Sequence, residues 1–173
     1  RRNLPSLGGH HAGARSTQSN AVFQERGRVL GLMGRDEAEI SRVEMTLCET
    51  LDLRNETVRI CYPFHGTKKF NFRETLEKHV KGLQTGHYEK LDLFLGERPF
   101  FAGENPTVAD FPVWEMLDQH ELMCKKYSLA SPLQKFSKLE AFYRRVRQIP
   151  QLKPYFESDA YGLPCNNKMA NFL

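Results

Sequence analysis

Apolar residues recur every three or four positions along most of the chain, which is the spacing of one face of an α-helix. The first run predicts a long helix from about Asp36 to Cys61. Its apolar stripe comprises Ile40, Val43, Leu47, Leu51 and Val58. Because proline disfavours helix at the residue before it, we expect this helix to end at Tyr62-Pro63.

The same spacing predicts a helical bundle after position 36. Further helices are expected at about 73–95, 108–123 and 132–148, followed by a short helix with Leu152, Tyr155 and Phe156. Gly96 is a suitable residue to end the first of them. The inward residues of the 132–148 helix are expected to be Leu133, Phe136, Leu139, Phe142 and Val146. The tail from Gly162 is expected to be irregular.

Residues 1–19 are not predicted to be helical, because glycines at positions 8, 9 and 13 mark turns. Short strands are expected at 4–7 and 14–17, then a helix that Ser19 caps and that continues to about Leu30. A glycine-rich linker follows at 30–35. The pattern therefore divides the chain into a small unit at 1–31 and a helical domain at 36–173.

Thr107-Val108-Ala109-Asp110 has the form of a helix-capping box. We expect the Thr107 hydroxyl to accept a hydrogen bond from the backbone three residues later. The Asp110 carboxylate should reach back to the N–H of Thr107. This element is structural, and it carries no chemistry of its own.

Composition excludes several classes of protein. No apolar run approaches the roughly 20 residues of a membrane span. The net charge is +4, but basic residues occur in doublets rather than in a patch, which argues against nucleic-acid binding. The four cysteines lack metal-ligand spacing, and His10-His11 lacks a second ligand pair. We expect a cytoplasmic protein with reduced cysteines and no metal.

Several motifs resemble those of glutathione transferases, and of the mu class in particular. They are Asn3-Leu4-Pro5, Thr17-Gln18-Ser19-Asn20-Ala21, Ile60-Cys61-Tyr62, Phe100-Phe101-Ala102-Gly103 before the capping box, and Lys168-Met169-Ala170. The resemblance covers nearly the whole chain. It implies a mainly α fold: the helical C-terminal domain of a glutathione transferase, preceded by a partial thioredoxin-like β-β-α remnant.

The resemblance also implies a binding site for glutathione as substrate. Asn3, Leu4 and a cis Pro5 would present backbone groups to its cysteinyl part. Gln18 and Ser19 would hold its γ-glutamyl carboxylate, since a helix N-terminus favours an anion. These residues also have a purely structural explanation, as a strand end and a helix cap, and both interpretations stay open.

Three residues of the first long helix and its end match other positions of the mu class. Asp52 would bind the amine of the glutathione that the partner subunit of a homodimer holds. The Tyr62 hydroxyl would act as an acid toward the electrophile, and Arg54 would share its cavity. A solvated helix-face acid for Asp52 and a core-packing aromatic for Tyr62 remain alternatives.

The mu-class tyrosine that activates the thiol lies in a first βαβ unit, and the printed sequence begins after it. The stretch between Pro5 and Gln18 is two residues longer than the mu pattern. Arg1-Arg2 stand where the family usually has an aromatic residue and a proline, and that aromatic residue locks the family dimer. We therefore expect a truncated transferase that conjugates glutathione to electrophiles but lacks its thiol activator. The alternative is an inactive scaffold subunit of a larger assembly.

Overall fold

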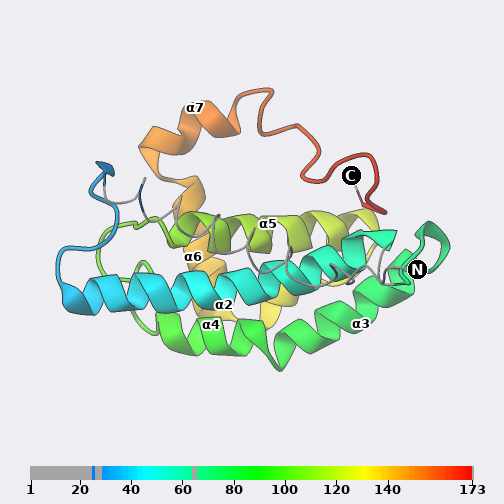
Figure 1. Cartoon of the computed structure of the whole chain (residues 1–173), viewed down its shortest axis with the longest axis horizontal. Helices are drawn as coiled ribbons and strands as arrows, with labels where there is room; N and C mark the ends of the chain where they lie inside the picture. The colour runs from blue at the N-terminus through cyan, green and yellow to red at the C-terminus, as the bar shows by residue number, and fades with distance from the viewer. Residues whose placement is uncertain (1–24, 26–28, 64–65, 173) are drawn as a thin grey trace, which may run out of the picture.

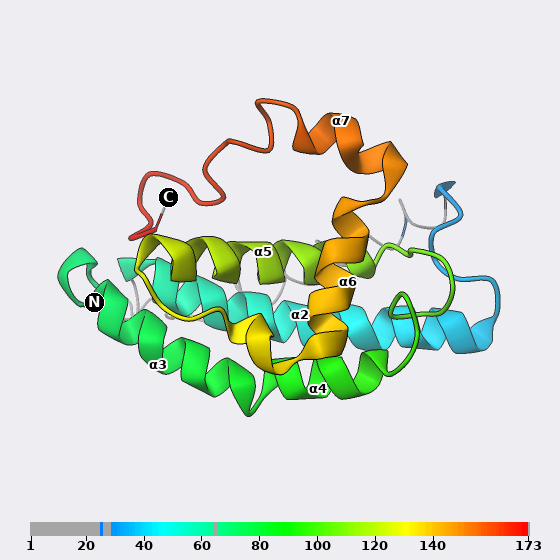
Figure 2. The same ribbon diagram turned by 180° about the vertical axis from the view of Figure 1, so that it is seen from behind.

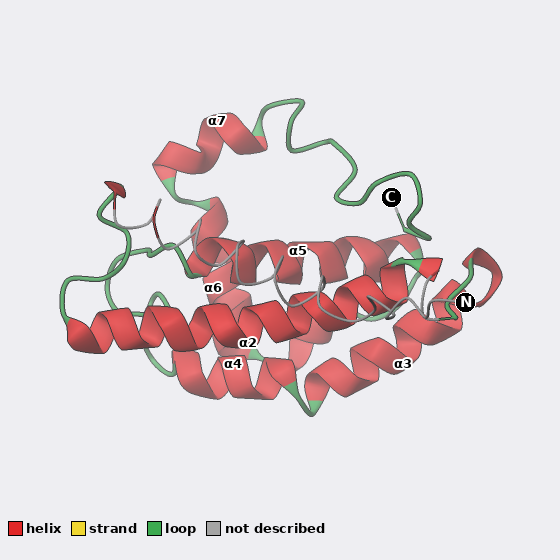
Figure 3. Ribbon diagram, in the orientation of Figure 1, coloured by secondary structure: helices red, strands yellow, loops and turns green. Residues whose placement is uncertain are grey.

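The computed structural model describes residues 25, 29–63 and 66–172, in which helices and loops, but no strands, occur (Figure 3). The α-helices are α2 (Glu37–Cys61), α3 (Phe72–Gln84), α4 (His87–Leu95), α5 (Asp110–Lys126), α6 (Ser137–Arg147) and α7 (Lys153–Phe156). Short 3-10 turns are η2 (Lys69–Asn71), η3 (Pro132–Lys135) and η4 (Pro150–Leu152). The predicted strands at 4–7 and 14–17 lie outside the described residues.

The long helices α2 and α5 lie side by side at the centre of the bundle (Figure 1). Helices α3 and α4 follow one another along α2, and α6 crosses α4 and α5 from behind (Figure 2). Helix α7 and the tail arch over α5. The main core joins these helices through buried side chains that include Leu53, Leu91, Phe101, Leu117, Leu139 and Phe142.

Helix α2 is confirmed, and Asp36 caps it by accepting a hydrogen bond of 2.8 Å from the Glu39 amide. Its predicted inner face is partly wrong, because Ile40 and Val58 are each 37% exposed. Threonines take inward positions instead: Thr46, Thr50 and Thr57 are buried. Each threonine hydroxyl donates to the carbonyl four residues earlier, at 2.6–2.8 Å, which removes the cost of burying it.

The single helix predicted at 73–95 is wrong, because the structure divides it into α3 and α4. Gly86 lies between them with φ −135° and ψ −106°, outside the helical region. A Cβ at this position would lie 3.1 Å from the Gly82 carbonyl oxygen, which glycine avoids. The predicted stop at Gly96 is confirmed, with φ +59° at the end of α4.

The helix predicted at 132–148 is also divided, into η3 and α6. Phe136 separates them with φ −128° and ψ 80°. The predicted inward residues are buried or partly buried nonetheless. The apolar spacing was therefore a better guide to the buried face than to continuity of the helix. The irregular tail is confirmed, since no helix follows α7 in the described residues.

The capping box before α5 is half confirmed. The Asp110 carboxylate accepts from the Thr107 amide at 2.6 Å, as predicted. The Thr107 hydroxyl, however, donates to the same carboxylate at 2.7 Å instead of accepting from the backbone. The carboxylate also accepts from the Phe101 amide at 2.9 Å, so it joins two parts of the loop to the helix.

Candidate functional site

The end of α2 meets the C-terminal tail, and Tyr62 lies at this junction. Tyr62 leaves the helix with φ −110° and ψ 147°, as the residue before a proline must. Its hydroxyl accepts a hydrogen bond of 3.4 Å from the Asn167 amide of the tail. One residue earlier, the Cys61 carbonyl accepts from the Asn171 amide at 2.6 Å. The tail is thus fixed over the residues that end α2.

Apolar contacts complete this junction. The Phe172 ring is buried and stacks on Phe72 of α3, with ring centroids 6.3 Å apart. The Lys126 ammonium lies 4.9 Å from the centroid of the Phe172 ring, a cation–π contact. The last described residue therefore belongs to the core that Cys61 and Phe72 share.

A small pocket of about 110 Å³ opens beneath the tail and brings the predicted Arg54 and Tyr62 together. Its other walls are Thr57, Val58, Cys61, Glu115, Met116, Gln119, Cys165 and Asn166. The lining thus combines the Arg54 guanidinium and the Tyr62 phenol with two thiols and the Glu115 carboxylate. Cationic and phenolic groups of this kind can stabilise negative charge that develops on a bound electrophile.

The structure places Asp52 elsewhere. Helical residues that are two positions apart in the sequence are separated by about 200° around the helix axis. Asp52 and Arg54 therefore point to different sides of α2. Asp52 lines a separate pocket of about 600 Å³ between α2, α3 and α4. Both signs of charge occur there, on Asp52, Glu56, Arg59 and Lys90, and His79 and His87 also line this pocket. Asp52 and Tyr62 therefore do not share one cavity of this chain.

Beside this pocket lies a buried polar chain that the sequence did not reveal. His120, wholly buried on α5, has Nδ1 3.1 Å from the Tyr88 hydroxyl and Nε2 3.1 Å from the Thr57 hydroxyl. The Thr57 hydroxyl donates to the Leu53 carbonyl, so it accepts from His120 Nε2. The Nδ1 atom of His120 then carries no proton and accepts from Tyr88.

His79 continues the chain toward the pocket, with its Nε2 3.2 Å from the Nε2 of His120, so the single N–H of His120 is shared between the Thr57 hydroxyl and His79. Burial lowers the pKa of His79 to about 4 and that of His120 well below its usual value. Both rings are therefore neutral at pH 7. Nearby, His87 Nδ1 lies 2.6 Å from Glu49, which ties the start of α4 to α2. These histidines are far apart in the sequence, so only their pairing in space identifies them.

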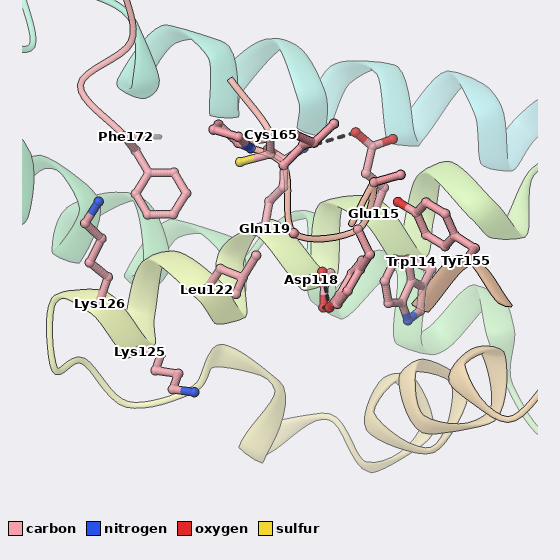
Figure 4. A pocket seen from close by; sticks show the side chains of 15 residues that line it. Trp114, Glu115, Asp118, Gln119, Leu122, Lys125, Lys126, Tyr155, Cys165 and Phe172 are labelled. Atoms are coloured by element: carbon pink, nitrogen blue, oxygen red, sulfur yellow. Dashed lines mark hydrogen bonds between the residues drawn. The ribbon is translucent and has the colours of Figure 1, made fainter. Parts of the chain in front are cut away.

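A wider cleft of about 830 Å³ separates α5 from α7 and the tail (Figure 4). Arg147 of α6 contacts the lining residue Tyr161, because its guanidinium donates to the Tyr161 hydroxyl at 2.7 Å; the same guanidinium lies 4.8 Å from the Phe156 ring centroid. The Asp118 carboxylate accepts from the hydroxyls of Tyr143 and Tyr161. This cluster fixes the start of the tail, as Tyr62 and Phe172 fix its end.

The remaining predicted residues are not tested. Asn3, Leu4, Pro5, Gln18 and Ser19 lie outside the described residues. Within 29–63 and 66–172, no group of three or more His, Cys, Asp or Glu side chains could hold a metal ion. None of the helices in that part of the chain is long and apolar enough to cross a membrane.

Comparisons with known proteins agree with this helical architecture. The sequence model of the family "Glutathione S-transferase, C-terminal domain" matches residues 51–159. Glutathione S-transferase Mu 3 of Homo sapiens is 32% identical over 158 residues, which cover 90% of this chain and 64% of that protein. Glutathione S-transferase Mu 1 of Oryctolagus cuniculus is 34% identical, covering 92% of this chain and 66% of that protein.

Solved structures give the same result. The Pi-class glutathione S-transferase of Onchocerca volvulus superposes with a TM-score of 0.71 at 26% identity, over 88% of this chain and 70% of that one. The glutathione S-transferase Blo t 8 gives a TM-score of 0.77 at 24% identity, over 89% of this chain and 69% of that one. The latter match bears on the fold alone.

The fold and these matches define the helical domain of a glutathione transferase, as the sequence motifs predicted. The chain belongs to the glutathione S-transferase family, and the curated relatives that it matches are mu-class members. It spans 64% of the length of the human Mu 3 relative.

Proposed function

We propose that this chain belongs to a mu-like transferase that conjugates the sulfur of glutathione to electrophilic substrates. The observation that carries this proposal is the pocket beneath the tail, which Arg54 and Tyr62 both line. The mu-class identity of its relatives supports the same activity. Asn3, Leu4, Pro5, Gln18 and Ser19 are proposed to hold glutathione, as the resemblance implies.

In the proposed reaction, the glutathione thiolate forms a bond with an electrophilic carbon. When the electrophile is an epoxide, the carbon–oxygen bond breaks and the oxygen becomes negative. The Tyr62 hydroxyl would give that oxygen its proton, or donate a hydrogen bond to it. The Arg54 guanidinium would stabilise the same charge across the pocket. Both groups then act on the electrophile and not on the sulfur.

Asp52 has a different proposed role, because it faces another pocket. We assign it to the ammonium group of a glutathione held by a second copy of the chain, where it would form a charge-assisted hydrogen bond. Two exposed apolar side chains on the helices around that side, Met45 of α2 and Leu93 of α4, are 59% and 73% exposed. A homodimer that covers these helices would remove both side chains from water.

No residue assigned here lowers the pKa of the glutathione thiol. We therefore propose that the 173-residue chain binds glutathione but does not accelerate its conjugation. The second candidate function is a catalytically inactive subunit of a larger assembly. A single preparation of the chain can distinguish these two proposals.

The test combines retention on immobilised glutathione with conjugation to an aryl chloride activated by nitro groups. Retention without conjugation above the background of free glutathione supports the proposal. Retention with conjugation that is slower in Tyr62→Phe, but not in the exposed control Tyr155→Phe, supports the transferase function. That result would overturn the proposal that the chain does not accelerate conjugation. Failure to be retained, together with copurification in a large complex, overturns the transferase proposal in favour of the scaffold.

A further inference from the structure

Two cysteines that are far apart in the sequence meet beside the small pocket. Cys61 is the last residue of α2 and is only 1% exposed, whereas Cys165 lies exposed on the tail. Both are free thiols, and both line the pocket of about 110 Å³. It is much smaller than the clefts of about 600 and 830 Å³ elsewhere in the described chain.

One side chain lies beside both thiols. The Asn166 amide donates to the Cys165 sulfur at 3.5 Å, and Asn166 lines the same pocket as Cys61 and lowers the pKa of the Cys61 thiol. The Cys61 thiol in turn donates to the Met123 sulfur at 3.9 Å. Because both cysteines and Asn166 line one small pocket, movements of the side chains and of the tail could bring the two sulfur atoms to bonding distance.

The tail around Cys165 is held at two points and exposed between them. Tyr161 is held by Arg147 and Asp118, and Asn167 donates to Tyr62. Between these anchors, residues 162–165 are exposed and carry no helix. A short segment with few buried contacts can adjust at low cost to the geometry that a disulfide requires.

We propose that Cys61 and Cys165 form a reversible disulfide by exchange with glutathione disulfide. In the first step, the Cys165 thiolate attacks one sulfur of glutathione disulfide, and one glutathione leaves as its thiolate. In the second step, the Cys61 thiolate attacks the Cys165 sulfur, and the second glutathione leaves. The two protein thiols are oxidised, glutathione disulfide is reduced to two glutathiones, and the two thiol protons pass to these products.

The surroundings of the thiols set the order of the steps. Burial raises the pKa of Cys61 to about 12, and Cys165 and Asn166 are the groups that face it. Burial also raises the pKa of Cys165, with Glu115 and Asp118 adding to this effect and Lys126 opposing it. The exposed Cys165 therefore reacts first. Closure by Cys61 should become up to about tenfold faster per pH unit below its pKa, as the thiolate fraction rises.

The disulfide would tie the end of α2 to the tail across the pocket that contains Arg54 and Tyr62. Oxidation would then fix the tail over this pocket and restrict entry of an electrophile. This consequence rests on the proposed function. The formation of the disulfide does not, because it is measured by mass and requires no conjugation activity.

The experiment incubates the full chain with glutathione disulfide at pH 8 and pH 9 and records intact masses and non-reduced peptide maps. The variants are Cys165→Ser, at an exposed position, and Cys48→Ser, a matched exposed cysteine of α2. We expect the unchanged chain and Cys48→Ser to lose two hydrogen atoms and to yield a peptide that joins Cys61 to Cys165. This should occur faster at pH 9, and Cys165→Ser should not yield it.

The proposal is overturned if the reaction stops at a glutathionyl group on Cys165 at both pH values. It is also overturned if Cys48 joins the disulfide, or if the chain does not react. Reduction with dithiothreitol should restore the original mass. A transferase test that fails while the Cys61–Cys165 peptide forms would reject the proposed function and leave this inference standing.

Discussion

At the scale of single residues, Asp110 organises the loop before α5 with one carboxylate. It is fully buried, and burial raises its pKa, while hydrogen bonds from Phe101 and Thr107 oppose that shift. The sequence predicted the bond to the Thr107 amide. It could not predict the bond to Phe101, which depends on how the preceding loop folds back. The same carboxylate therefore joins helix and loop, beyond its role in a cap.

Replacing Asp110 with asparagine should destabilise the fold by about 2–3 kcal/mol, because an amide nitrogen would face donors that now meet an acceptor. Thr107→Val should cost only about 1 kcal/mol, since the carboxylate keeps both amide donors. The exposed control Glu104→Gln should stay within about 0.5 kcal/mol of the unchanged chain. Urea unfolding measures all three variants. An Asp110→Asn variant as stable as the control would contradict this account.

The buried histidines predict how stability changes with pH. His79 has a pKa of about 4 in the folded chain, against about 6.5 when unfolded. The unfolded state therefore binds more protons between these values, so stability is complete above pH 6.5 and falls as pH falls toward 4. Burial is the main cause; Glu56 raises this pKa and His87 lowers it.

His79→Gln keeps an acceptor for His120 but cannot titrate. Between pH 7 and pH 4.5 the unchanged chain should lose on the order of 2 kcal/mol more stability than this variant. Urea unfolding at both pH values gives the difference. Equal losses in the two proteins would show that His79 is not buried as a neutral ring.

At the scale of helices, apolar spacing predicted which elements exist and largely which residues they bury. It failed where polar residues behave as core residues, as the threonines of α2 do by bonding to their own helix. It also failed at Gly86 and Phe136, where the backbone leaves the helical region while the apolar stripe continues. Apolar spacing reports which side chains are buried. A local break in the helical backbone leaves that spacing nearly unchanged, so the spacing does not reveal the break.

Two threonines on the buried face of α2 should respond differently to the same substitution. Thr50→Val removes only a bond within the helix, so stability should change by less than about 0.5 kcal/mol. Thr57→Val also removes an acceptor from buried His120 and should cost about 1 kcal/mol or more. Thermal and urea unfolding of both variants compare them directly. Equal effects would exclude a contribution from the contact with His120.

Helix α7 and the start of the tail should depend on Arg147. Arg147→Gln removes the contacts to Phe156, Tyr161 and Asp118. The backbone amides at 153–162 should therefore exchange hydrogen several-fold faster. A tenfold increase would correspond to about 1.4 kcal/mol. Arg144→Gln is the matched control, since Arg144 forms only an exposed pair with Glu140 in the same helix. Unchanged exchange in Arg147→Gln would contradict the conclusion that Arg147 holds α7 and the start of the tail in place.

At the scale of the whole molecule, the sequence predicted the family and the helical domain, because its motifs occur in order along the chain and its apolar spacing is helical. The placing of Arg54 and Tyr62 in one pocket, with Asp52 in another, follows from the turn of α2 and from the course of the tail. The turn of α2 can be derived from the sequence, but the course of the tail is visible only in the folded chain. The paired thiols and the histidine chain likewise join residues that are far apart in the sequence.

The most direct test of the proposed function is calorimetric titration of the 173-residue chain with a glutathione conjugate of an epoxide, which carries a hydroxyl beside the sulfur. The account predicts saturable binding to the chain, with Tyr62→Phe binding about fivefold to tenfold more weakly, for the loss of roughly one hydrogen bond. The control Tyr155→Phe should bind as the unchanged chain does. Absence of binding, or equal loss in the two tyrosine variants, would contradict the assignment of this pocket.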